Sequence, residues 1–212
     1  MHYIEHIARD KRLKKLIDEQ GHHAIKKRKN IYIYLCASIM SQQLSTKVAD
    51  VIYKRFLNLY GGKEPSPQQV LETAHETLRS IGLSNAKARY IQNVARFEIE
   101  FGMNSNKLGK MTNEEVIEYL IPIKGVGRWT VEMLLMFALG REDVFAVDDL
   151  GIQNAMIGLY KLSREDKKQF REDMLRISKK WSPYRTYACM HLWRWRDNTP
   201  IEKENTKKQK SR

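Results

Sequence analysis

Two glycines separated by one residue are the feature of this sequence best suited to binding a phosphate. Gly125 and Gly127 lie between two predicted helices, in the stretch Leu120-Ile-Pro-Ile-Lys-Gly-Val-Gly-Arg-Trp-Thr130. Glycine lets the backbone turn sharply and approach another surface with no side chain in the way. N–H groups at the start of the next helix would then face that surface and favour an anion. A bare Gly-x-Gly is more typical of an ordinary turn, but the apolar Val126 and the immediate helix start favour phosphate binding.

A pair of carboxylates follows about twenty residues after these glycines. Asp148 and Asp149 open another predicted helix, and a helix N-terminus favours the ionised form of a carboxyl group. An ionised carboxylate can stabilise the positive charge that develops on a sugar as its glycosidic bond breaks. Taken alone, an Asp pair at this place is more typical of an N-cap, so the residues leave both interpretations open.

The cysteines and histidines do not predict a metal centre. Cys36 and Cys189 are far apart in the sequence, whereas an iron–sulfur cluster needs four close thiolates and a zinc site needs ligand pairs at short spacing. We expect two reduced, buried thiols. The adjacent His22 and His23 lack a third ligand. Neither a catalytic metal nor an organic cofactor is therefore expected.

Composition favours a folded protein with a polyanionic partner. The chain has 212 residues and a net charge of +13. Its hydrophobic content of 42% and aromatic content of 9% exclude a wholly disordered protein. Residues 202–212 carry only a minor part of that charge, so the body itself is basic, and nucleic acid is the commonest partner of such a body. We see no membrane span or signal peptide. We expect a cytoplasmic protein at the nucleoid of a bacterium, or a nuclear one in a eukaryote.

Helices have to position these groups. Apolar periodicity and turn residues predict helices over Ile7–Glu19, Ile31–Ile39, Lys47–Leu59, Gln68–Ala74, Ala86–Phe101, 112–121, 128–139, 149–160, from Ser163 onward, and over Tyr184–Trp195. Thr112 and Glu115 have the spacing of a capping box. Only 144–147 has any strand character. We therefore predict an all-α fold, with residues 198–212 as a disordered basic tail.

The motifs around the two glycines and the Asp pair resemble those of a known family. The stretch from Ile121 to Met133, followed by Asp143-Val-Phe-Ala-Val-Asp-Asp-Leu-Gly-Ile152, resembles the helix-hairpin-helix DNA glycosylase superfamily, and within it the 3-methyladenine DNA glycosylase II branch. The similarity continues in 38–47 and 181–193 and covers about residues 8–196. It implies a two-lobed helical domain over residues 1–197, with both termini in one lobe and the active site in the interlobe cleft. It also implies a compact form without the N-terminal β-domain of some bacterial members.

The resemblance assigns the chemistry to Asp149, which matches the catalytic aspartate of that family, while Asp148 keeps a structural role. Trp129 stands where the strand-cleaving members have a lysine that forms a Schiff base, and Lys124 lies on the other side of the hairpin. We therefore expect hydrolysis of the N-glycosidic bond of alkylated purines, of the 3-methyladenine or 7-methylguanine type, with no lyase step.

A target base inside the duplex must be flipped into a pocket. By the resemblance, Trp129, Met133 and Trp193 line that pocket, where indole faces suit a cationic purine. Met133 stands where some relatives have an aromatic residue, so it leaves the substrate range open. Gln43 matches the residue that enters the gap left in the stack, and Leu44 is the alternative wedge.

The resemblance also implies contacts that hold DNA. Backbone carbonyls of Ile121, Ile123 and Val126 would bind an optional monovalent cation that supports phosphate binding by the hairpin. Arg128 and Thr130 would support the same contacts, although a solvated role for Arg128 is an alternative. The expected partner is damaged double-stranded DNA, bound by a monomer.

Three other functions stay open at this stage. A non-catalytic hairpin module would bind DNA but would not need Asp149, Trp129 and Trp193 in register. A glycosylase for deaminated, oxidised or mismatched bases would differ in its pocket, and the lyase type is opposed by the missing lysine. A basic structural protein would bind DNA without regard to damage. The sequence does not decide which damaged base is preferred.

Overall fold

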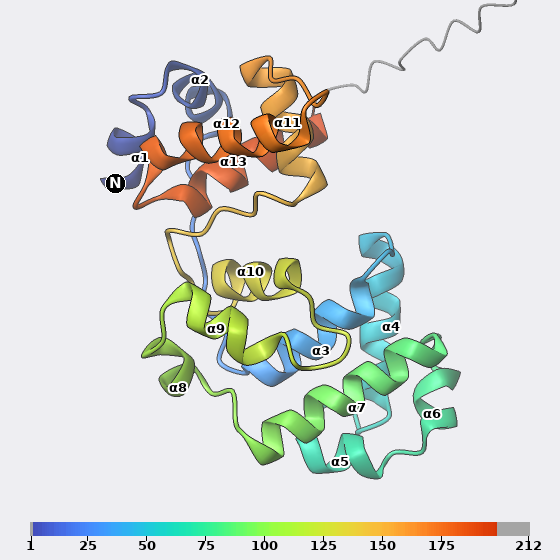
Figure 1. The fold of residues 1–212 in the computed structure, drawn as a ribbon. Helices are drawn as coiled ribbons and strands as arrows, with labels where there is room; N and C mark the ends of the chain where they lie inside the picture. Colours follow the sequence, from blue (N-terminus) through green and yellow to red (C-terminus); the bar gives the residue numbers. More distant parts are fainter. Residues whose placement is uncertain (1, 199–212) are drawn as a thin grey trace, which may run out of the picture. The chain divides into compact units, whose positions relative to one another are not determined.

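The computed structural model describes residues 2–198, and it is helical with no strand in that range (Figure 1). This confirms the predicted all-α fold. The predicted tail lies outside the described residues except for Asn198. None of the described helices is both long and apolar enough to cross a membrane.

The chain divides into two compact units. Unit 1 combines the N-terminal residues up to His23 with the residues from Val147 onward, and unit 2 is Ala24–Ala146. Unit 1 contains α1 (His2–Ile7), α2 (Lys11–Gln20), α11 (Leu150–Tyr160), α12 (Lys167–Ser178), the 3-10 helix η1 (Lys179–Trp181) and α13 (Arg185–Asn198). Unit 2 contains α3 (Ile31–Ser41), α4 (Thr46–Asn58), α5 (Pro67–Glu72), α6 (His75–Ser80), α7 (Asn85–Glu100), α8 (Ser105–Gly109), α9 (Asn113–Leu120) and α10 (Arg128–Phe137).

The core of unit 2 is built around α3. This helix is apolar on nearly every face, as expected for a helix surrounded by others, and it packs against α4, α7 and α10. Leu35, Cys36 and Ile39 are fully buried in it. Cys36 is a free, buried thiol, as predicted, and burial raises its pKa. The second cysteine, Cys189, is also free and buried.

Unit 1 is held together through Asp10. Its Oδ1 accepts hydrogen bonds from the N–H groups of Arg12 and Leu13 and so begins α2. Its Oδ2 accepts hydrogen bonds from the Tyr160 hydroxyl at 2.8 Å and from the Trp181 indole at 3.2 Å. The predicted continuous helix over 7–19 is therefore wrong: the chain breaks between α1 and α2 because this side chain caps the second helix.

Other predicted boundaries also needed correction. The helix placed from Ser163 onward begins at Lys167, because Asp166 accepts hydrogen bonds from the N–H groups of Lys168 and Gln169. Two short helices, α6 and α8, were missed because each is only one or two turns long. The strand-like residues 144–147 are buried but form no strand.

A buried histidine lies where α13 meets α2. His191 is fully buried, its Nδ1 pairs with Gln20 Oε1 at 2.9 Å, and Gln20 Nε2 donates to the His191 carbonyl at 3.2 Å. The His23 ring lies 4.4 Å from the His191 ring. Burial, with His23 and Arg194 nearby, lowers the pKa of His191 to about 3. The imidazole is therefore neutral in the folded protein at physiological pH.

Candidate active site

The hairpin between α9 and α10 begins with the predicted capping box. Thr112 Oγ1 accepts the Glu115 N–H at 3.2 Å, and Glu115 Oε2 accepts the Thr112 N–H at 2.6 Å. This reciprocal pair fixes the start of α9. The turn then closes with the Val126 N–H donating to the Ile123 carbonyl at 2.9 Å.

The two hairpin glycines have different surroundings. Gly125 has φ +104°, and a Cβ added there would lie 2.3 Å from Cγ of Tyr90, so this glycine serves the fold. Gly127 has φ −101°, which any residue can adopt, and a Cβ added there would meet nothing within 4 Å. Gly127 is also the N-cap of α10, and no side chain caps that helix. The space that a Cβ at 127 would occupy is therefore open to an approaching ligand.

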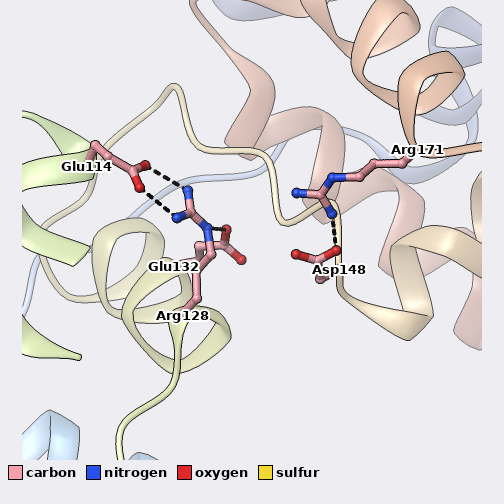
Figure 2. Close-up of polar contacts among 5 residues, drawn as sticks. All are labelled: Glu114, Arg128, Glu132, Asp148 and Arg171. Atoms are coloured by element: carbon pink, nitrogen blue, oxygen red, sulfur yellow. Dashed lines mark hydrogen bonds and ion pairs between the residues drawn. The ribbon is translucent and has the colours of Figure 1, made fainter. Parts of the chain in front are cut away.

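Arg128 is placed differently from the predicted phosphate contact. Its guanidinium binds both carboxylate oxygens of Glu114 at 2.7 Å, and its Nε lies 3.3 Å from the buried Glu132 (Figure 2). These carboxylates raise the pKa of Arg128 above its usual value. Because its charge is neutralised locally, the arrangement favours a role in joining α9 to α10. The phosphate contact stays a prediction for Arg128.

The remaining predicted residues of α10 differ in accessibility. The Trp129 side chain is exposed, at 44% of its surface. Thr130 and Met133 are buried, and the Met133 carbonyl accepts the Tyr34 hydroxyl at 3.1 Å. Because the Thr130 side chain is buried, its backbone N–H near the start of α10 is the group suited to a phosphate, and the phosphate contact stays a prediction. Trp129 and Met133 are four residues apart and so share one face of the helix.

The predicted wedge residues occupy the loop between α3 and α4, residues 42–45, which we call the wedge loop. Gln43 is exposed and has φ +59°, an uncommon left-handed conformation for a residue other than glycine. Leu44 is also exposed, and Ser45 caps α4 by accepting the Val48 N–H. The loop therefore projects both candidate wedges from the surface of unit 2.

Lys87 on α7, which we did not predict from sequence, holds the wedge loop in place. Its ammonium donates to the Met40 carbonyl at 3.0 Å and to the Gln42 carbonyl at 2.5 Å. Burial lowers the pKa of Lys87. The amide of Gln42 in turn donates to the Gly125 carbonyl at 3.4 Å, so the wedge loop also contacts the hairpin.

The same face of α7 supports the hairpin. Tyr90 lies against Gly125, and Asn93 donates to the Lys124 carbonyl at 3.2 Å. Lys87, Tyr90 and Asn93 recur every three residues and so lie along one side of the helix. One rigid helix thus sets the positions of both the wedge loop and the hairpin. The sequence carried no local signal for this, because the partners are 31 to 47 residues away.

In unit 1, Asp149 is the N-cap of α11 and is held by two donors. The N–H of Ile152 and the indole Nε1 of Trp193 each lie 2.8 Å from its Oδ1. The two donors hold this carboxylate oxygen in one position. The structure therefore brings together two of the predicted site residues, Asp149 and Trp193, which are 44 positions apart.

Gly151 makes room for this pair. A Cβ added there would lie 3.0 Å from Asp149 Oδ1, 3.0 Å from Trp193 Cδ1 and 3.1 Å from Arg196 Nη1. Any larger residue would therefore press on the Asp149–Trp193 hydrogen bond. This requirement could not be predicted from the sequence, because it depends on contact with Trp193, 42 residues away, and not on the helical conformation of Gly151.

Asp148 has a separate partner. Its carboxylate pairs with the guanidinium of Arg171 on α12 (Figure 2). This ion pair agrees with the structural role predicted for Asp148. The two neighbouring carboxylates therefore have different partners: Asp148 forms an ion pair with α12, and Asp149 accepts hydrogen bonds from α11 and α13.

The hairpin carbonyls fit a cation in part. The Ile123 carbonyl accepts the Val126 N–H. Those of Ile121 and Val126 accept no hydrogen bond from the described residues. Unsatisfied carbonyl oxygens are suitable ligands for a hard cation.

Comparison with known proteins decides the family. Residues 36–180 match the HhH-GPD superfamily of base excision DNA repair proteins. The chain belongs to this superfamily. It is 36% identical over 187 residues to DNA-3-methyladenine glycosylase 1 of Schizosaccharomyces pombe, covering 87% of this chain and 80% of that protein.

Solved structures of HhH-GPD relatives have the same fold. One is the Schizosaccharomyces pombe 3-methyladenine DNA glycosylase in complex with abasic DNA, with a TM-score of 0.81, 32% identity, and coverage of 92% of this chain and 96% of that one. Another is DNA-3-methyladenine glycosidase from Bacillus halodurans, with a TM-score of 0.78, 36% identity, and coverage of 91% and 87%. The predicted family and fold class are therefore confirmed.

The HhH-GPD match includes the wedge loop, the hairpin and Asp149, but it ends before Trp193. The hydrogen bond from Trp193 to Asp149 is thus a feature of the structure that the family match alone does not supply.

Proposed function

We propose that this protein is a monofunctional DNA glycosylase that hydrolyses the N-glycosidic bond of alkylated purines in duplex DNA and leaves an abasic site. The observation that carries the proposal is the Asp149 carboxylate, held at the start of α11 by the Ile152 N–H and the Trp193 indole. The named relatives, which are DNA-3-methyladenine glycosylases, support the alkylpurine substrate.

The reaction needs charge stabilisation more than acid catalysis. As the C1′–N bond breaks, its electron pair leaves with the base, and the sugar acquires oxocarbenium character that a carboxylate stabilises. A water molecule then adds to C1′ and gives up a proton. A purine that already carries a positive charge leaves as a neutral base, so no strong general acid is required. Asp149 stabilises the sugar and can also orient the water.

Helix α10, which follows the hairpin, contains no lysine that could form a Schiff base for strand cleavage. Trp129 occupies the position at which a Schiff-base lysine would lie in the lyase members, and Lys124 precedes the hairpin glycines. The exposed indole of Trp129 instead offers a face on which a flipped, cationic purine can stack. Met133 lies on the same face of α10 as Trp129, and Gln43 or Leu44 fills the gap in the duplex.

A monovalent cation at the carbonyls of Ile121, Ile123 and Val126 would strengthen phosphate binding. The two unsatisfied carbonyls support this assignment. Such an ion would add positive charge beside the backbone of Gly125–Gly127 and take no part in bond cleavage. The protein would act on DNA in the nucleoid of a bacterial cell or in the nucleus of a eukaryotic one.

The test is release of free bases from methylated duplex DNA by the wild type and by Asp149→Asn. Asp148→Asn is the matched control, since that carboxylate is paired with Arg171. The wild type and the control should release methylpurines and leave alkali-labile but uncut abasic sites, whereas Asp149→Asn should bind DNA without release. Excision by Asp149→Asn at the wild-type rate would overturn the assignment of the carboxylate.

Failure of the wild type would separate the alternatives. Release of deaminated or mismatched bases alone would move the substrate to that class. Binding of DNA with no release of any base would leave a helix-hairpin-helix binding module.

A further inference from the structure

A basic hollow lies beside the hairpin on unit 2. Its volume is about 500 Å³, and its lining includes Arg89, Arg96 and Lys124 together with Tyr90, Gln92 and Asn93. We call this feature the α7 hollow. Arg89 and Arg96 are seven residues apart on α7, so they project from one face of the helix two turns apart.

No described residue neutralises the cations of the α7 hollow. The side chains of Arg89, Arg96 and Lys124 make no ion pair or hydrogen bond with any described residue, and no carboxylate is among the residues that line the hollow. Glu100 enters only an adjoining, shallower hollow. Three unpaired cations around a concave surface produce a positive potential that attracts an anion.

Two other basic places on the molecule differ in this respect. Arg128 is bound by two carboxylates. In unit 1, the hollow around Arg171 and Arg164 contains Asp148, which pairs with Arg171, while Arg164 donates to Gln153. Of these three basic regions, the α7 hollow is the one whose cations are not paired with a described carboxylate.

The polar side chains in the hollow fix its walls. The amide of Asn93 donates to the Lys124 carbonyl and that of Gln92 to the Thr73 carbonyl, while Tyr90 packs against Gly125. Because the fold holds the walls in place, binding of a ligand requires little further ordering of the backbone. The guanidinium groups are left as the donors, and they suit the oxygens of a phosphodiester.

We propose that the α7 hollow is a second binding site for DNA backbone phosphates, next to the one at the hairpin N-terminus. The occupant is the backbone of the damaged duplex itself, because Lys124 both lines the hollow and immediately precedes Gly125. A strand held at Gly127 is thereby led to Arg89 and Arg96. This site rests on the proposed function only in that the bound polyanion is duplex DNA.

The test is the salt dependence of binding to a duplex that carries an abasic-site analogue, for the wild type and Arg89→Gln/Arg96→Gln. Log K falls with log salt concentration, and each phosphate contact contributes about 0.9 to the steepness of that fall. The double variant should therefore reduce the steepness by about 1.8. Its single-turnover excision rate at saturating protein should equal that of the wild type, because Asp149 lies in the other unit.

Two comparison variants make the result specific. Lys63→Gln/Lys110→Gln removes the same charge from exposed positions outside the hollow and should leave the slope near the wild-type value. Arg89→Lys/Arg96→Lys keeps the charge and should retain most of the slope. An unchanged slope in Arg89→Gln/Arg96→Gln, or an equal decrease in the Lys63/Lys110 variant, would overturn the proposal. Failure of the proposed function would instead appear as absent base release by the wild type.

Discussion

Gly125 and Gly127 are two positions apart, yet alanine at each should impair a different property: stability at 125 and DNA binding at 127. At Gly125 the new Cβ meets the Tyr90 ring at 2.3 Å on a backbone with φ +104°. The backbone strain costs about 1–3 kcal/mol and the overpacking about 1–3 kcal/mol. A total near 4 kcal/mol should lower Tm by about 8–16 °C, at about 2–4 °C per kcal/mol for a chain of this size.

Gly127→Ala should leave the fold nearly intact and weaken DNA binding. Its Cβ meets nothing in the chain, and alanine for glycine at an N-cap costs only about 0.5–1 kcal/mol. The same Cβ would obstruct hydrogen bonds from the α10 N-terminus to a phosphate. Because a hydrogen bond to a charged group contributes about 1.5–3 kcal/mol, DNA affinity should fall about ten- to hundredfold.

Thermal unfolding followed by circular dichroism, and titration with a fluorescent abasic duplex, measure both effects. A cycle with Tyr90→Ala checks the cause, since Gly125→Ala should cost less once the ring is gone. Equal Tm values for the two alanine variants, or full affinity in Gly127→Ala, would refute the division of roles between these glycines.

Three further results are expected. Trp193→Phe keeps an aromatic ring but removes the hydrogen-bond donor to Asp149. Single-turnover excision should therefore slow about ten- to hundredfold, while Tm should stay within a few degrees of the wild-type value. An unchanged rate would contradict a positioning role for the indole. Lys87→Met should slow excision of a paired lesion more than excision of a lesion in a single-stranded loop, because Lys87 holds the wedge loop. Lys87→Arg should restore part of the excision rate on the paired lesion. Equal slowing on both substrates would argue against this role of Lys87. His191 has a pKa of about 3 when folded and about 6.5 when unfolded, so the unfolded state binds more protons between these values. Stability should be complete above pH 6.5 and fall as the pH drops toward 3, and Tm measured from pH 7 to 5 should fall less steeply in His191→Gln.

Much of the fold could be predicted because many of its signals are local. The capping box of Thr112 and Glu115 and the helix start at Asp149 depend on residues within one turn, and the structure has both. Asp10 shows the limit of this approach. Its neighbours are compatible with one long helix, whereas in the structure its Oδ1 caps α2 and its Oδ2 accepts hydrogen bonds from Tyr160 and Trp181, 150 and 171 residues away.

The candidate site could be predicted where a motif carries the chemistry, but not where packing does. Asp149 and the hairpin glycines came from motif and resemblance. Lys87 and Gly151 have ordinary helical surroundings in sequence, and their roles depend on contacts with distant segments. Arg128 shows what the motif left out: the resemblance implies a phosphate contact, which stays a prediction, but it gave no indication that Glu114, 14 residues earlier, binds the guanidinium.

The composition of unit 1 has a consequence for the order in which function arises during synthesis. The segment 24–146, with the hairpin and the wedge loop, leaves the ribosome as one continuous stretch. Helices α1 and α2 are made first, yet α2 lacks its packing partner until α13 emerges, and Asp149 lacks its indole donor until Trp193 is added. A nascent chain thus contains the whole hairpin and wedge loop before it contains Asp149, and the Asp149 carboxylate gains its second hydrogen bond only once α13 has been made.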